Sequence, residues 1–291
     1  MITQELRDRL SHKQIVFTFS TGRCGTNFLT KIMELQPIVF SVHESNQRLD
    51  DVRWRFKDNP GLKNEYIIEK LELIADAPKP VYFESSHLNC KEILIPLIAN
   101  GIEFNLIFLY RTIKEVALSM YHLNDIPGRT KSGIRWLLDP TDEGNILPID
   151  PDNYTDIQLC IWYCLEMQYR QEAFHQSINK LGWINYTISL DRLKKLYIVN
   201  SMFRHFNLPL LNSQQSLQYE NLCDIKHNDK IARKWHLSSK GIVRHLGPDW
   251  DYRQDIKYVE TSTKPHINKK IVNYYSNLDL LYVKNLSLQG E

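Results

Sequence analysis

Short apolar runs, rich in β-branched and aromatic residues, alternate along the first two thirds of the chain with segments of helical periodicity. The runs predict strands at 14–20, 38–42, 81–85 and 104–110, and a fifth strand is expected at 183–188. The runs at 14–20 and 104–110 are apolar almost without a break, which is typical of strands that are buried on both faces of a parallel sheet.

Helical periodicity fills the intervals between these strands. Apolar residues recur at helical spacing in the segments 28–36, 62–76, 90–99, 112–123, 154–179 and 190–206. The first of these helices is expected to end at Pro37, because proline stops a helix. Buried strands that alternate with helices predict an α/β fold, a three-layer sandwich with a central parallel β-sheet.

The last third of the chain is more polar and less periodic, with a basic segment at 226–244. No repeat or linker marks a boundary, so a single domain over 1–291 is expected. The stretch 136–156 differs from the rest, since it holds six carboxylates and no Lys or Arg. Long loops in compact domains are often lids or binding loops. This acidic loop is therefore expected to border a ligand.

Composition excludes several classes of protein. The chain carries 36 Lys or Arg and 34 Asp or Glu, a net charge of +2, whereas a dedicated nucleic-acid binder shows a strong basic excess. The five cysteines have no metal-binding or disulfide spacing, the N-terminus has no signal-peptide core, and no apolar run is long enough to span a bilayer. A cytoplasmic protein without a bound metal, a nucleic-acid partner or a membrane segment is expected.

A glycine-containing loop follows the first predicted strand and leads into a helix. The N–H groups of a first helical turn lack partners and carry the positive end of the dipole, so an anion binds well there. Gly22 and Gly25 allow the tight turn, Arg23 adds a charge, and Thr26 and Asn27 add donors. The loop lacks the Lys and the spacing of the nucleotide-triphosphatase P-loop and the G-x-G-x-x-G pattern of dinucleotide sites. An ordinary strand-to-helix turn is the alternative.

A second candidate anion site follows the strand at 104–110. Arg111 directly follows this strand, and Ser119 comes eight residues later on the next helix. Ligands of open α/β sheets bind outside the carboxyl ends of the strands, so Arg111 is expected at the same edge as the Gly22 loop. A guanidinium and a hydroxyl that converge there would suit a second phosphate, and a surface salt bridge of Arg111 is the alternative.

These two motifs resemble those of the sulfotransferases that use 3′-phosphoadenosine 5′-phosphosulfate (PAPS). Residues 21–29, T-G-R-C-G-T-N-F-L, resemble the family's 5′-phosphosulfate loop, and residues 110–122, with V-A-x-S-x-Y, resemble its 3′-phosphate motif. The motifs occur in the family's order, and the resemblance covers the chain up to about residue 125. It implies a P-loop-like sulfotransferase fold, PAPS as sulfuryl donor and 3′-phosphoadenosine 5′-phosphate (PAP) as product.

The resemblance also implies a role for each matching position. Arg23 would stabilise the charge that develops on the leaving phosphate. Arg111 and Ser119 would hold the 3′-phosphate. The 5′-phosphosulfate would be cradled by the loop residues Gly22, Arg23, Cys24, Gly25, Thr26 and Asn27, of which Cys24 stands where a Ser is usual.

The acceptor must lose a proton, so a general base is expected within hydrogen-bond reach of it. The segment 85–88, S-S-H-L, resembles the family's K-T-H-L segment, whose His is the base. His87 is therefore the predicted base, although Ser85 replaces the Lys of that segment. Glu44 and His43, after the second strand, are the alternatives, because some sulfotransferases use a carboxylate at about that place.

Further positions match the family in part. Tyr186, near the fifth strand, is at the place of an adenine-contacting Tyr. Within 226–250, a segment expected to cover the nucleotide, Lys240-Gly241 and the later Asp249-Trp250 resemble part of the loop R-K-G-x-x-G-D-W. Lys240, Gly241 and Arg244 are therefore candidate nucleotide contacts, with a solvated basic loop as the alternative.

The acceptor is expected to be a small molecule. Four carboxylates are candidates to contact it: Glu44, Asp139, Asp142 and Glu143. By electrostatic complementarity they favour a cationic or polyhydroxylated acceptor, such as a secondary metabolite, unless 136–156 is only a solvated loop.

The predicted activity is transfer of the sulfuryl group from PAPS to a hydroxyl or amine. A non-catalytic binder of phosphoadenosine nucleotides is the alternative. A nucleotide or small-molecule kinase is disfavoured because the P-loop Lys is missing.

Overall fold

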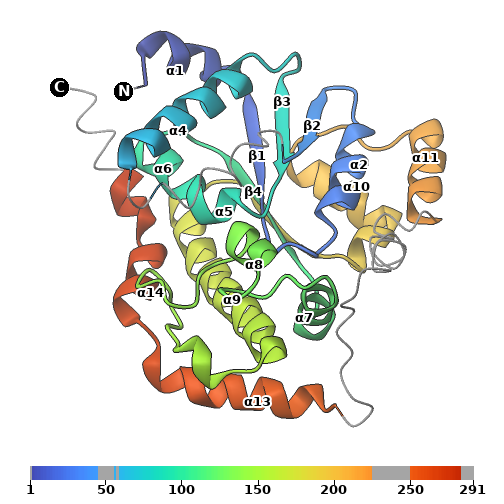
Figure 1. The fold of residues 1–291 in the computed structure, drawn as a ribbon. Coiled ribbons are helices and arrows are strands. Elements are labelled where there is room, and N and C mark those ends of the chain that lie inside the picture. The colour runs from blue at the N-terminus through green and yellow to red at the C-terminus, as the bar shows by residue number, and fades with distance from the viewer. Residues whose placement is uncertain (1, 45–55, 57–58, 225–249, 283–291) are drawn as a thin grey trace. The chain divides into compact units, whose positions relative to one another are not determined.

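The structure is a computed structural model, and it describes residues 2–44, 56, 59–224 and 250–282. These residues form one five-stranded parallel sheet in the order β2-β3-β1-β4-β5 (Figure 1). Its strands are β1 (Gln14–Phe19), β2 (Val39–His43), β3 (Val81–Ser85), β4 (Asn105–Tyr110) and β5 (Asn185–Ser189). The α/β class with a parallel sheet is thereby confirmed, and each predicted strand is found to within two residues at either end.

The helices of the described residues are α1 (Gln4–Ser11), α2 (Thr26–Glu34), α4 (Pro60–Ala75), α5 (Asn89–Glu92), α6 (Leu94–Ala99), α7 (Ile113–His122), α8 (Lys131–Trp136), α9 (Asp156–Leu181), α10 (Leu196–His205), α11 (Ser213–Asp224), α13 (Tyr252–Thr263) and α14 (Lys269–Ser276). Short 3-10 turns are η2 (Pro151–Asn153), η3 (Arg192–Lys194) and η5 (Lys264–His266). The helix expected at 90–99 is divided into α5 and α6, and the one expected at 190–206 into η3 and α10. Among the described residues, no helix combines the length and apolar character that a membrane span requires.

The helices α2 and α4 pack on opposite faces of the sheet (Figure 1). On one face, the Thr30 hydroxyl of α2 lies 2.7 Å from the Ser85 hydroxyl of β3. On the other face, Lys70 of α4 forms an ion pair with Glu84 of β3. Successive residues of a strand point to opposite faces, so these two contacts place one helix on each side of β3. The sheet is therefore the middle of three layers.

β1 is the central strand and its side chains form the centre of the core. Val16, Phe17 and Phe19 are fully buried. The Phe17 ring meets the rings of Phe104 and Tyr82 edge-on, at centroid distances of 5.7 and 6.3 Å. A strand covered by helices on both faces needs apolar residues on both, which explains its unbroken apolar run.

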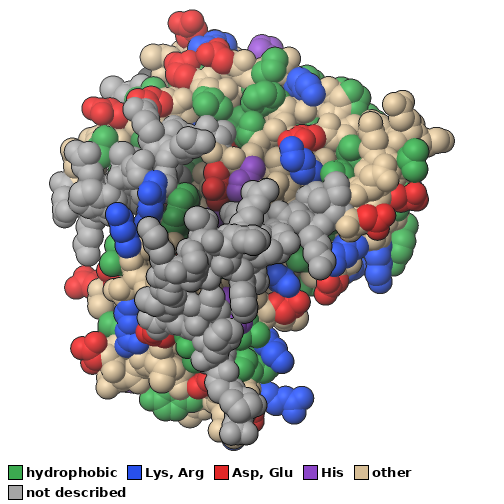
Figure 2. All heavy atoms as spheres, turned by 45° about the vertical axis from the view of Figure 1, so that its right-hand side comes forward, with side chains coloured by type: hydrophobic (Ala, Val, Ile, Leu, Met, Phe, Trp, Pro, Cys, Tyr) green, Lys and Arg blue, Asp and Glu red, His purple; other side chains and the backbone are tan. Residues whose placement is uncertain are grey.

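The chain folds into two compact units. The first comprises residues 1–110, 175–225 and 277–291 and contains the sheet, and the second comprises residues 111–174 and 226–276. The expected single domain over 1–291 stays a prediction. The described part of the face in Figure 2 carries acidic and basic side chains in small interspersed groups, in keeping with the net charge of +2.

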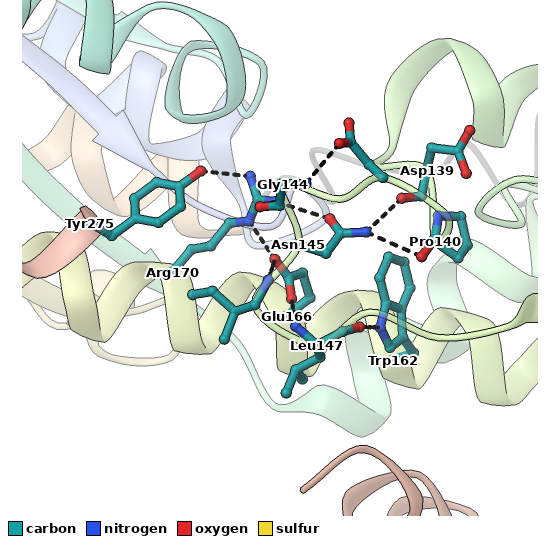
Figure 3. Close-up of polar contacts among 11 residues, drawn as sticks. Asp139, Pro140, Gly144, Asn145, Leu147, Trp162, Glu166, Arg170 and Tyr275 are labelled. Atoms are coloured by element: carbon teal, nitrogen blue, oxygen red, sulfur yellow. Dashed lines mark hydrogen bonds and ion pairs between the residues drawn. The ribbon is translucent and has the colours of Figure 1, made fainter. Parts of the chain in front are cut away.

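In the second unit, the acidic stretch 136–156 is anchored to α9 by a buried polar network (Figure 3). The Glu166 carboxylate, fully buried, accepts hydrogen bonds from the backbone N–H groups of Ile146 and Leu147 at 3.0 and 2.7 Å. Arg170 donates to Glu166 at 2.6 Å and to the Tyr275 hydroxyl at 2.9 Å. The middle of the stretch is thus bound to the helix beneath it.

The arginine also holds the loop directly. Its guanidinium donates to the Gly144 carbonyl and to Oδ1 of Asn145, both at 3.0 Å (Figure 3). Asp139 and Asp142 accept hydrogen bonds within their own turns, from the N–H groups of Thr141 and Gly144, each at 2.9 Å. Asp139, Asp142 and Glu143 are exposed. Their contact with an acceptor, and the use of the loop as a lid, stay predictions.

Candidate functional site

The loop between β1 and α2 has an unusual backbone. Gly22, Arg23 and Gly25 have left-handed φ angles of 81°, 56° and 92°. Successive N–H groups in such turns form concave anion sites, and here the turn leads directly into the N-terminus of α2. For Arg23 this conformation is strained, and strain of this kind is concentrated at functional sites. The binding of an anion by this loop stays a prediction.

Among the loop residues, Cys24 is the one whose role the sequence defines least. Its side chain is 1% exposed, and its Sγ lies 2.8 Å from the Thr21 hydroxyl. The thiol therefore faces the interior of the protein. An anion in the loop would meet the backbone of Cys24 and not its sulfur.

Ser85, at the end of β3, stabilises the helix turn that follows the loop. It is fully buried, and its hydroxyl donates to the Thr26 carbonyl at 2.8 Å. Thr30 donates to the same carbonyl at 3.0 Å. These bonds fix the first turn of α2 against the end of β3. The position at which the resembling family has Lys thus serves here to anchor the helix that carries the loop.

The predicted base and both of its alternatives lie in one cluster beside the loop. His43 pairs with Ser85 in the sheet register, so β2 and β3 end side by side. The His87 Nε2 lies 3.8 Å from Oε1 of Glu44, and the His43 Nδ1 lies 4.0 Å from Oε2 of Glu44. Gly22 lies against the imidazole, since a Cβ built at position 22 would be 3.1 Å from Cγ of His87.

Two further contacts complete this cluster. The Thr26 hydroxyl lies 3.1 Å from Nε2 of His43, which ties the start of α2 to the end of β2. Lys91, in α5, places its Nζ 2.9 Å from Nδ1 of His87. Sequence reasoning missed Lys91. The available signal was its spacing of four residues from His87, which puts the two on one face when the chain turns helically.

A groove with a volume of about 580 Å³ runs beside the edge strand β2. His43 and Glu44 line one end of it, and the residues 76–78 after α4 also line it. Lys31 and Glu34 line it from α2 and form an ion pair at 2.8 Å. The Glu44 carboxylate is thus accessible from a space that can hold a small molecule.

Arg111 and Ser119 belong to the second unit. Thr112 caps α7, accepting from the Glu115 N–H, and Arg111 donates to Glu115 at 3.0 Å. Arg111 precedes α7, whereas Glu115 and Ser119 lie four residues apart on one side of this helix. A phosphate held by Arg111 and Ser119 would therefore share the guanidinium with Glu115. Whether these residues converge with the Gly22 loop stays a prediction.

Tyr186 is the remaining candidate within the described residues. It is the second residue of β5, three residues before the strand ends, and its ring is 5.4 Å from the ring of His205. Lys240, Gly241 and Arg244 lie outside the described residues, as does the segment 226–249. Within the described part of the chain, no group of three or more His, Cys, Asp or Glu side chains is placed to hold a metal ion.

Replacing Gly25 by Ala is expected to lower the free energy of unfolding by about 2–3 kcal/mol. The φ of 92° is strained for any residue with a side chain, and the new Cβ would overlap Cδ1 of Leu190. Urea denaturation measures the loss.

Gly182→Ala is the matched control for this prediction. Gly182 has a φ of 71° but nothing within 4 Å of its added Cβ, so this variant has strain without overlap. Its loss should be about 1–2 kcal/mol. Equal losses in the two variants would contradict the close packing of Leu190 on the loop.

No protein-family model and no curated protein sequence matches the chain. Among solved structures, that of the mouse sulfotransferase SULT7A1 complexed with PAP is similar to it, with 14% sequence identity, a TM-score of 0.45 and 94% of each chain covered. At this identity and TM-score the match does not show membership of a family.

Proposed function

We propose that the protein is a PAPS-dependent sulfotransferase, which transfers a sulfuryl group to a hydroxyl or amine of a small acceptor and releases PAP. The observation that carries the proposal is the arrangement at the carboxyl edge of the sheet. A strained glycine loop bearing Arg23 begins α2, and Gly22 of that loop lies against His87. His87, Glu44 and His43 are linked by contacts of 3.8 and 4.0 Å.

The chemistry needs both parts of this arrangement. The N–H groups of the loop and Arg23 would bind the 5′-phosphosulfate of PAPS. As the acceptor attacks sulfur, the bond from sulfur to the bridging phosphate oxygen breaks, and that oxygen takes the electron pair. A fixed cation and preorganised N–H donors stabilise this developing charge. A base in the cluster takes the proton of the acceptor.

The other predicted contacts belong to the same proposal. Arg111 and Ser119 would bind the 3′-phosphate, Tyr186 the adenine, and the segment with Lys240, Gly241 and Arg244 would cover the nucleotide. The acceptor would enter the groove beside β2, where Glu44 lies. A carboxylate there suits a cationic or polyhydroxylated small molecule, such as a secondary metabolite.

Calorimetric titration with PAP, beside AMP and ATP, tests the donor. PAP is expected to bind at least about tenfold more tightly than AMP, because a charge-assisted contact to the 3′-phosphate contributes about 1.5–3 kcal/mol. Arg111→Ala should remove this preference. The exposed Arg135, which stacks on Trp136, supplies the matched control, and Arg135→Ala should keep the preference. Equal binding of PAP and AMP would refute PAPS as the donor.

A further inference from the structure

The contact between Lys91 and His87 determines which nitrogen of the imidazole carries a proton. The Nζ of Lys91 lies 2.9 Å from Nδ1 of His87. A lysine ammonium has three donors and no acceptor, so Nδ1 must accept. A neutral imidazole carries one proton, which must then be on Nε2. The contact therefore selects one tautomer of His87.

That tautomer presents a donor to Glu44. The Nε2 of His87 lies 3.8 Å from Oε1 of Glu44, so an Nε2–H group faces a carboxylate oxygen. A ring nitrogen that already carries a proton has no lone pair with which to take one from an acceptor. A carboxylate keeps lone pairs on both oxygens.

The exposure of the two side chains also favours Glu44 over His87 as the group that meets an acceptor. The side chain of His87 is 13% exposed and that of Glu44 is 30% exposed. Glu44 also lines the groove beside β2, where a small molecule can be held. Lys91 is 9% exposed, so its ammonium is largely shielded from water and interacts strongly with its partner.

We propose that Lys91 fixes His87 as the Nε2–H tautomer, and that Glu44 is the group that takes the proton of the acceptor. Lys91 and His87 are then positioning residues, and Glu44 is the catalytic base. The catalytic half of this proposal rests on the proposed sulfotransferase function, whereas the tautomer does not. The assignment reverses the order of preference that the sequence alone suggested.

Proton transfer to Glu44 accompanies sulfuryl transfer to the acceptor. The O–H or N–H bond of the acceptor breaks and its proton goes to a Glu44 oxygen, while the acceptor atom forms a bond to sulfur. The bond from sulfur to the phosphate oxygen breaks, and that oxygen leaves on PAP with the electron pair. The His87 Nε2–H group faces the Glu44 carboxylate across 3.8 Å, and the Lys91 ammonium holds the imidazole in this orientation.

The tautomer is tested by ¹⁵N NMR of the imidazole nitrogens in the full chain at about pH 8, where ordinary histidines are neutral. The His87 signal is identified by its loss in His87→Gln. Wild type should show Nε2–H, and Lys91→Met should shift the ring toward the Nδ1–H form. Lys63→Met is the matched control, since Lys63 pairs with Glu92 at 3.1 Å, and should leave the signal unchanged. An Nδ1–H ring in wild type, or no change in Lys91→Met, would overturn the assignment.

The base is tested by comparing two variants in sulfuryl transfer from PAPS to a panel of small phenols, amino alcohols and amines. Glu44→Gln should lower kcat by about 10²–10⁴-fold, the usual contribution of a general base. His87→Gln keeps an N–H donor and should lower kcat by less than about tenfold, with Lys91→Arg retaining more activity than Lys91→Met. The opposite order of Glu44→Gln and His87→Gln would make His87 the base. Absence of any transfer by wild type would refute the proposed function and not the tautomer, which the NMR experiment measures without nucleotide.

Discussion

Replacing Lys70 by methionine is expected to lower the free energy of unfolding by about 3–5 kcal/mol, because it leaves a buried carboxylate without its partner. The side chains of Lys70 and Glu84 are 0% and 2% exposed and form an ion pair between α4 and β3. The Tyr82 hydroxyl donates to the same carboxylate at 2.5 Å. Chemical denaturation of wild type and variant at neutral pH measures the difference.

The pH dependence of this loss gives a second test. Burial acts to raise the pKa of Glu84, but the Lys70 ammonium and the hydrogen bonds from Lys70 and Tyr82 lower it below its ordinary value of 4.5. In the variant burial acts without the ammonium, so the pKa should be higher. A carboxyl group whose pKa is lowered in the folded protein contributes stability that is lost as the pH falls. A carboxyl group whose pKa is raised in the folded protein destabilises it at neutral pH, and this destabilisation disappears as the pH falls. The difference between the two proteins should therefore shrink between neutral pH and about pH 4.

Two controls separate the ion pair from other causes. Lys70→Met combined with Glu84→Met should recover most of the loss, since a buried pair is often replaced by apolar side chains at little cost. Lys31→Met breaks the exposed pair with Glu34, 46% and 40% exposed, and should change stability by only about 0–1 kcal/mol. A loss in the double variant as large as in Lys70→Met would show that packing, and not the unpaired charge, is responsible.

The strands β1, β3 and β4 could be predicted from the sequence because they are buried on both faces over almost their whole length. Burial of this kind gives unbroken apolar runs such as 14–20, and each run proved to be a strand. The order of the strands could not be predicted, because it depends on pairings such as Gln14 with Val81 that leave no local pattern. Lys70 and Glu84 were missed for a related reason. Each lies at a buried position of its own element, where an apolar residue is usual, and only the packing of α4 on β3 brings the two together.

The short polar helices could not be predicted from the sequence pattern either. α1, α8, α11, α13 and α14 were not expected, because few apolar residues mark such helices and the packing of those few, such as Leu6 and Leu10 of α1, stabilises them. Thr3, for example, caps α1 by accepting from the Leu6 N–H. Similarly, the acidic stretch was expected to be a long loop, and only the structure shows that Glu166 and Arg170 bind it to α9.

The candidate site was predictable where its residues are local in sequence. The turn at Gly22 to Asn27 depends on glycines within six positions. His87 and Glu44 were expected near it as candidates for the base, because the segments that hold them resemble those of the sulfotransferase family. The role of Ser85 was not predictable, and the only signal for that of Lys91 was its spacing of four residues from His87. Ser85 contacts Thr26 across 59 residues, and the contact of Lys91 with His87 depends on the turn that begins α5.

Removing the charge of Arg23 is expected to lower the rate of turnover strongly. If the loop binds the 5′-phosphosulfate, Arg23→Ala should lower kcat by about 10²–10³-fold, as removal of a preorganised donor to a developing anion does. The effect should be smaller on the affinity for PAP, because several backbone N–H groups remain in the loop. Single-turnover kinetics with PAPS, beside calorimetry with PAP, separates the two quantities.

The backbone of Arg23 supplies the matched control for this prediction. Its φ of 56° is strained for any side chain, so Arg23→Gly relieves the strain while removing the same charge. Arg23→Gly should therefore be at least as stable as Arg23→Ala and equally impaired in kcat, whereas Arg23→Lys keeps a cation and should retain more activity than either. If Arg23→Gly turned over as fast as wild type, the charge would not act in the transition state. The strained conformation would then serve only to shape the turn, and the leaving phosphate would need another cation.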